Sequence, residues 1–128
     1  MPDWPALYDS WHRAPDGESR HAAIQNAQRA VAVPSPERWD WLCAALEDSE
    51  RRRFVARVFH CQPVPNALFE PMLRAVLEED ASSCRSFLHP LIGTFGLEAV
   101  RERLREWRPP RDVMGRVAYW LRPVPLRR

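Results

Sequence analysis

The 128-residue sequence predicts an all-α fold, specifically a short α-solenoid of about four helix pairs. Turn-forming residues recur about every thirty residues, and between them hydrophobic residues follow a helical period without a convincing strand pattern. One helix pair cannot bury the apolar faces of both its helices, so neighbouring pairs must stack. The turns are Pro34-Ser35-Pro36, Pro63-Val64-Pro65, Gly93-Thr94-Phe95-Gly96 and Pro123-Val124-Pro125. They divide a single domain, 1–128, into pairs of approximately 2–33, 34–65, 66–96 and 97–125.

The first helix of each pair is indicated by an apolar stripe along one face. The predicted first helices are residues 5 to about 13, 36–47, 67–79 and 97–107. Ser35 followed by Pro36 is typical of an N-cap with proline at the first helical position. The stripes are Leu7, Tyr8 and Trp11; Trp39, Leu42 and Leu46; Met72, Leu73, Val76 and Leu77; and Val100, Leu104 and Trp107.

The second helices show the repeat most clearly. Asp16, Glu18 and Arg20 align with Asp48, Glu50 and Arg52 at a single offset, and the arginine recurs at Arg85 and Arg111. Asp16, Asp48 and Asp80 precede second helices, where a carboxylate accepts hydrogen bonds from free amides and favours the helix dipole. The stripes are Phe54, Val55, Val58 and Phe59; Phe87, Leu88, Leu91 and Ile92; and Val113, Met114, Val117 and Ala118.

The run LEDSERRRFVARVFHCQPVPNALFEPMLRAVLEE, residues 46–79, resembles the short HEAT-type repeats of phycobilin-lyase-like HEAT proteins. The likeness extends over residues 34–108, and it departs from the family in placing Phe54 and Phe87 where alanine is usual. The resemblance implies that the recurring Arg20, Arg52 and Arg85 pair with acidic residues of adjacent repeats and are structural.

The charge is unevenly distributed along the chain. All nineteen basic residues are arginine, and the formal net charge is +2. Residues 1–96 hold ten arginines and thirteen acidic residues, whereas residues 97–128 hold nine arginines and four acidic residues. An anionic partner is therefore expected first at the C-terminal quarter.

No catalytic motif stands out, and neither a cofactor nor a metal is expected. The three cysteines, Cys43, Cys61 and Cys84, have no CxxC spacing and are interpreted as buried small hydrophobic residues. The chain lacks a run of ~18 apolar residues and begins without the order of a secretory signal, which predicts a cytoplasmic protein without a membrane span. The family likeness alone leaves a lyase-like activity open, but a fold analogy does not establish a reaction.

The leading functional hypothesis is a non-enzymatic scaffold or adaptor that holds a protein partner on the face of the second helices. The tryptophans Trp11, Trp39 and Trp107 lie on core stripes, whereas Trp4, Trp41 and Trp120 lie off them. Exposed Trp, Tyr and Arg side chains are typical of binding hot spots. The candidate contacts are Arg53, Arg57, His60 and His89 on the helix layer, and Arg116, Tyr119, Trp120 and Arg122 at the C-terminal end. Trp120 is alternatively a packing residue that covers the last core.

The alternative hypothesis is nucleic-acid binding through the Arg-rich C-terminal quarter. Its candidate residues are Arg101, Arg105, Arg108 and Arg111. A homo-oligomer, or a place inside a larger complex, also stays open, because Trp-rich ends would otherwise leave apolar surface in water.

Overall fold

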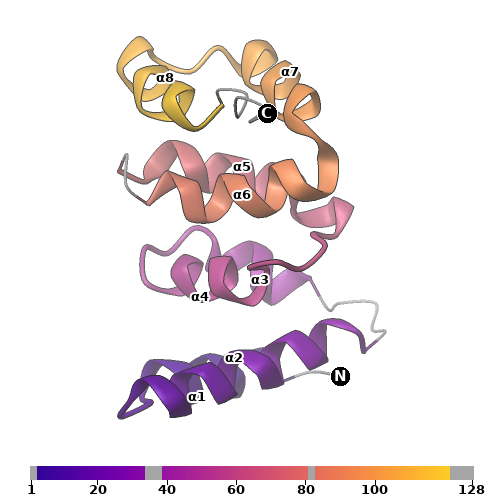
Figure 1. Cartoon of the computed structure of the whole chain (residues 1–128), viewed down its shortest axis with the longest axis vertical. Coiled ribbons are helices and arrows are strands. Elements are labelled where there is room, and N and C mark those ends of the chain that lie inside the picture. The colour runs from indigo at the N-terminus through magenta and orange to yellow at the C-terminus, as the bar shows by residue number, and fades with distance from the viewer. Residues whose placement is uncertain (1–2, 34–38, 81–82, 122–128) are drawn as a thin grey trace, which may run out of the picture.

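The computed structural model describes residues 3–33, 39–80 and 83–121. Within these ranges every regular element is a helix, which confirms the predicted all-α class. Figure 1 shows the helices arranged in chain order along the long axis, with the first two at one end and the last two at the other. None of the helices in the described ranges is long and apolar enough to cross a membrane.

The first helices are α1, α3, α5 and α7, and each is followed by a second helix, α2, α4, α6 or α8. A short 3₁₀ turn, η1 (Asn66–Leu68), leads into α5, and η2 (Tyr119–Leu121) follows α8. The bounds of the α-helices are α1 Trp4–His12, α2 Gly17–Val31, α3 Asp40–Ala45, α4 Arg51–Val58, α5 Phe69–Glu78, α6 Cys84–Phe95, α7 Leu97–Trp107 and α8 Arg111–Ala118.

The predicted boundaries agree with α1, α5 and α7 to within about two residues. The predicted turn at 93–96 is shorter than expected, because α6 continues to Phe95 and only Gly96, at φ 90°, breaks the chain direction. Glycine adopts this backbone conformation without steric cost. Ser35, Pro36 and the predicted turn at 123–125 lie outside the described residues.

The predicted aspartates make one recurring hydrogen bond at the starts of α2, α4 and α6. Asp16 accepts from the Ser19 amide at 2.7 Å, Asp48 from the Arg51 amide at 2.9 Å, and Asp80 from the Ser83 amide at 2.8 Å. Each bond satisfies an amide that has no partner within its helix. The repeated sequence pattern therefore corresponds to a repeated local structure.

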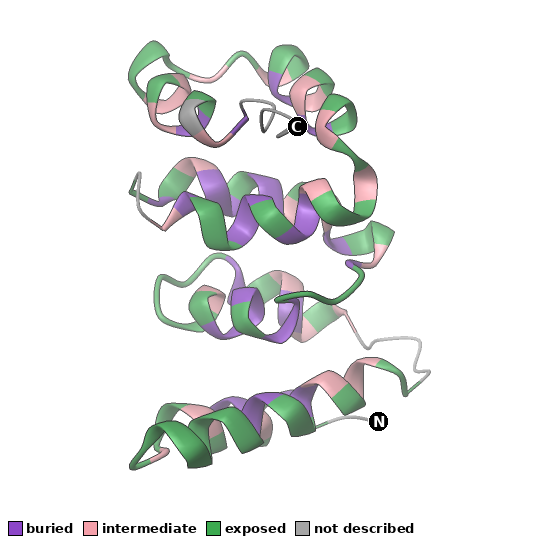
Figure 2. Cartoon of the chain, in the orientation of Figure 1, coloured by how far each residue is buried: buried purple, intermediate pink, exposed green. Residues whose placement is uncertain are grey.

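A single hydrophobic core runs through all the layers, and Figure 2 shows its buried residues on the sides where the helices meet. The predicted stripes supply most of it, including the fully buried Phe54, Phe59 and Phe87. The interpretation that Trp4 lies off the core is wrong, because only 3% of this residue is exposed. The prediction for the cysteines is right for Cys84, partly right for half-buried Cys43 and wrong for exposed Cys61.

Neighbouring layers are held together by polar contacts as well as by the core. The α2 helix packs on α4, and α4 packs on α6. Gln28 Nε2 donates to the Val58 carbonyl at 3.2 Å, and the Val64 amide donates to Thr94 Oγ1 at 3.0 Å. These bonds link residues thirty positions apart, so they tie one helix pair to the next.

Candidate binding surfaces

Four residues predicted to bind a partner lie exposed on or beside the second helices α4 and α6. Arg53 and Arg57 are four residues apart on α4 and therefore share one face of it. His60 follows the end of α4, and His89 lies on α6, which packs against α4. All four side chains are exposed. We call Arg53, Arg57, His60 and His89 the basic surface.

The acidic residues lie mostly on the first helices of the pairs, and the arginines lie mostly on the second helices. The four first helices carry seven acidic residues and four arginines, whereas the four second helices carry two acidic residues and nine arginines. The helices α4 and α6 contain no acidic residue. Dividing the charge by helix type would have revealed this pattern in the sequence, but the division by chain position concealed it.

The C-terminal quarter is less basic in structure than its composition suggests. Arg101 lies 3.0 Å from Glu98 and donates to the Leu121 carbonyl at 2.6 Å, and Arg103 pairs with Glu70 of α5. These arginines therefore hold the end of the chain together. Three further arginines that contribute to the composition, Arg122, Arg127 and Arg128, lie outside the described residues.

The other arginines of the nucleic-acid hypothesis are exposed. Arg105 and Arg108 line a pocket of about 440 Å³ together with Arg101 and apolar residues such as Leu104 and Met114. Arg111 is exposed at the start of α8 and does not line this pocket. The structure thus brings three of the four candidates together and separates the fourth.

The C-terminal contact patch is partly used inside the molecule. Arg116 is half-buried and donates to the Leu77 carbonyl at 3.3 Å. Trp120 is half-buried and packs against the core, with the Arg85 guanidinium 5.7 Å from its ring centre. These contacts favour the packing interpretation of Trp120 and show that Arg116 already makes one bond within the molecule. The side chain of Tyr119 and the whole of Arg122 lie outside the described parts of the chain.

The recurring arginines divide into two kinds. Arg52 Nε of α4 lies 3.0 Å from Glu79 Oε1 of the next pair, which confirms the expected pairing. Arg20 instead lies over Trp11 at 5.5 Å, and Arg85 lies over Trp120. Neither has an acidic partner among the described residues, so the expectation from the family resemblance is wrong for these two.

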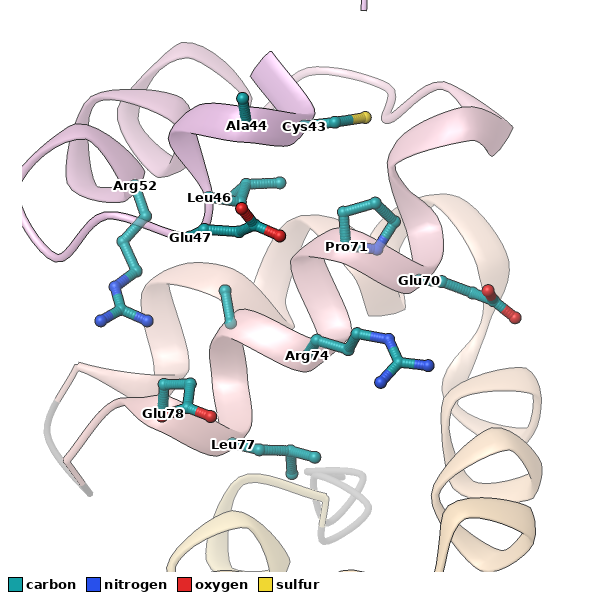
Figure 3. A pocket seen from close by; sticks show the side chains of 11 residues that line it. Cys43, Ala44, Leu46, Glu47, Arg52, Glu70, Pro71, Arg74, Leu77 and Glu78 are labelled. Carbon is teal, nitrogen blue, oxygen red and sulfur yellow. The ribbon is translucent and has the colours of Figure 1, made fainter. Parts of the chain in front are cut away.

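An open groove of about 700 Å³ lies between the first helices α3 and α5 (Figure 3). The sequence did not reveal it, because the stripes of both helices predict burial and say nothing of the space between them. Its lining residues are Cys43, Ala44, Leu46, Glu47, Arg52, Glu70, Pro71, Arg74, Ala75, Leu77 and Glu78. Within the described ranges, no group of three or more His, Cys, Asp or Glu residues could hold a metal ion.

The chain matches no protein-family model, and neither the curated proteins nor the solved structures include one that is detectably similar. The functional argument therefore depends on the residues themselves.

Proposed function

We propose that this chain is a HEAT-like scaffold without catalytic activity, which holds an acidic segment of a partner protein on the basic surface of α4 and α6. The proposed architecture is a short α-solenoid of four stacked helix pairs. It is supported by the chain-order arrangement of the layers, by the recurring aspartate bond and by the Arg52–Glu79 contact between neighbouring pairs.

The observation that carries the proposed binding function is the unpaired charge of α4. Arg53 and Arg57 are exposed, and no described carboxylate forms an ion pair with either. On α7, by contrast, each of the three glutamates lies within four residues of an arginine. Uncompensated arginines on one face favour a partner that supplies carboxylates, because charge complementarity increases association rate and specificity.

An acidic protein segment fits this surface better than a long nucleic acid. A duplex extends beyond two helices, and the chain as a whole carries a formal charge of only +2. The first helices add acidic residues on neighbouring surfaces that would repel a long polyanion. A short acidic segment needs to contact only the basic surface.

The proposal can be tested by capturing partners with three forms of the tagged protein, at low and at moderate salt. The forms are the wild type, Arg53→Gln/Arg57→Gln, and the matched control Arg105→Gln/Arg108→Gln. We expect the wild type and the control to retain the same stoichiometric protein, and the α4 variant to lose it. Both double variants remove two exposed arginines, so a general charge effect would weaken both equally.

Two outcomes would contradict the proposal. Retention of the partner by the α4 variant would show that the basic surface is not the binding site. Captured nucleic acid that is released as salt rises, and that the Arg105→Gln/Arg108→Gln variant no longer binds, would support the nucleic-acid hypothesis instead.

A further inference from the structure

The groove between α3 and α5 is a second candidate site, formed by the first helices rather than by the basic surface. Its floor is apolar, since Leu46 and Ala75 are buried and Pro71 and Leu77 are half-buried. Figure 3 shows Glu47 reaching in from the α3 side with its carboxylate turned toward Pro71. The lining thus combines an apolar base with charged groups at its edges.

The charges of the groove leave two carboxylates without internal partners. Arg52 faces Glu79, and Glu70 pairs with Arg103. Glu47 and Glu78 are exposed, and neither forms an ion pair with any described residue. Two carboxylates at the rim of an apolar groove are complementary to a cationic side chain with apolar neighbours.

Two arginines line the groove, Arg52 and Arg74. Arg74 forms no ion pair with a described carboxylate, and its side chain points away from Glu47 (Figure 3). The Arg74 guanidinium lies 4.6 Å from the centre of the Trp107 ring of α7. Figure 3 shows Arg74 extending toward Glu70, away from Glu47. Arg74 is therefore placed at the end of the groove toward α7, and it forms no ion pair with Glu47 or Glu78.

We propose that this groove binds a segment of a partner protein in which a lysine or arginine stands beside an apolar side chain. The apolar side chain rests on Leu46, Ala75 and Leu77, and the cation lies near Glu47 and Glu78. This site is distinct from the basic surface and selects the opposite charge. A chain with both sites can hold a basic and an acidic partner segment together.

Cys43 lines the groove and provides a direct way to test its preference. Two short peptides serve as probes, N-acetyl-Cys-Leu-Lys-amide and N-acetyl-Cys-Leu-Glu-amide. Each is supplied as a mixed disulfide and brought to thiol–disulfide equilibrium with the folded protein. Peptide mapping by mass spectrometry then gives the occupancy of each cysteine. Cys61 is exposed and lies outside the groove, so it serves as an internal reference.

We expect Cys43 to carry the lysine peptide at least about fivefold more than the glutamate peptide, with no such preference at Cys61. Glu47→Gln/Glu78→Gln should abolish the preference. The control Asp9→Asn/Glu18→Gln, which removes two exposed carboxylates outside the groove, should retain it. Because Cys43 is half-buried, Ala44→Cys offers a second attachment point from an exposed groove residue.

The proposal is overturned if neither attachment point prefers the lysine peptide, or if the preference survives in Glu47→Gln/Glu78→Gln. Light scattering tests a different occupant. A dimer of the wild type that is lost in the Glu47→Gln/Glu78→Gln variant would assign the groove to a second copy of this chain. These outcomes do not depend on the basic surface, so they are independent of the test of the proposed function.

Discussion

The C-terminal end of α5 is contacted by polar side chains from three other helices. Arg52 of α4 reaches the Glu79 carboxylate, Arg116 of α8 donates to the Leu77 carbonyl, and the Cys84 thiol of α6 donates to the Val76 carbonyl at 3.3 Å. Burial raises the pKa of the Cys84 thiol, which keeps it protonated as a donor at neutral pH. Free carbonyls at a helix end attract such donors.

Arg52→Ala should destabilise the protein by about 3 kcal/mol, because it leaves the Glu79 carboxylate buried without a counter-charge. The Arg52 and Glu79 side chains are only 11% and 8% exposed. Their facing atoms are close but not aligned as a hydrogen bond, so charge attraction holds the pair. Chemical denaturation measures the change in the free energy of unfolding.

The double variant Arg52→Met/Glu79→Leu is the control for this prediction, since apolar replacement of both partners removes the buried charge and should recover most of the stability. Partner binding should persist in both variants. An unchanged melting temperature combined with lost binding would instead make Arg52 a contact residue.

Asp16 should make a stability contribution that depends on pH. The hydrogen bond from the Ser19 amide lowers the pKa of Asp16 below its ordinary value of 3.8. A carboxyl group with a lowered folded-state pKa stabilises the fold above its unfolded pKa, and this contribution is lost as pH falls through the folded pKa. Asp16→Asn should therefore melt below the wild type near pH 6, and the difference should close as the pH falls below 3.8 and through the lowered folded-state pKa. A difference that stays constant across this range would contradict the assignment.

At the scale of the helices, the sequence predicted what is local and periodic. The aspartate bonds and the apolar stripes depend on residues three or four positions apart, so they can be recognised in the chain itself. The Arg52–Glu79 contact was anticipated only through the family resemblance, and the bond from Arg116 to Leu77 was not predicted because the two residues are distant in sequence. The same reason explains the unpredicted groove, whose existence depends on the spacing between α3 and α5.

Phe54 joins the first two helix pairs, at a position where the HEAT-type repeats that the sequence resembles usually have alanine. Its ring lies 5.6 Å from that of Tyr8 and 5.7 Å from that of Trp11 in α1, and 6.2 Å from that of Trp41 in α3. The side chain is fully buried. The large residue thus fills the space between layers that a small one would leave empty.

Phe54→Ala should lower the free energy of unfolding by about 3–5 kcal/mol, since it removes this ring and leaves a cavity. Phe54→Leu keeps most of the volume and should cost clearly less. Calorimetry of both variants checks the order. Equal effects would mean that the cavity does not determine the loss, and would point to relaxation of α1 around the vacated space.

For the whole molecule, the excess of arginine belongs to the second helices and the excess of acidic residues to the first helices. The C-terminal quarter appeared basic because its composition was counted along the chain, although α7 alternates arginine with glutamate. The structure sorts the same residues by helix, and the excess of arginine then falls on the second helices.

This division predicts a salt-dependent affinity for acidic protein. The affinity for a short glutamate-rich peptide should fall at least about tenfold between 50 and 300 mM salt, because the Debye length over which exposed charges interact shrinks from about 14 Å to about 6 Å. Arg53→Gln/Arg57→Gln should lower the affinity at low salt and flatten this dependence, whereas Arg105→Gln/Arg108→Gln should not. Fluorescence anisotropy across a salt series measures both slopes.

Because the aspartate bonds are evenly spaced, we expect residues 48–79 to act as a building block that can be duplicated. The block starts at Asp48, ends at Glu79 and contains both members of the Arg52–Glu79 pair. Each copy would therefore contain its own ion pair between neighbouring helix pairs. A chain in which this block is duplicated in tandem should fold as a longer stack, with higher helical content and a cooperative transition. Circular dichroism and small-angle scattering would detect the added layer. The protein could then be lengthened by whole blocks without redesigning the contacts between neighbouring helix pairs.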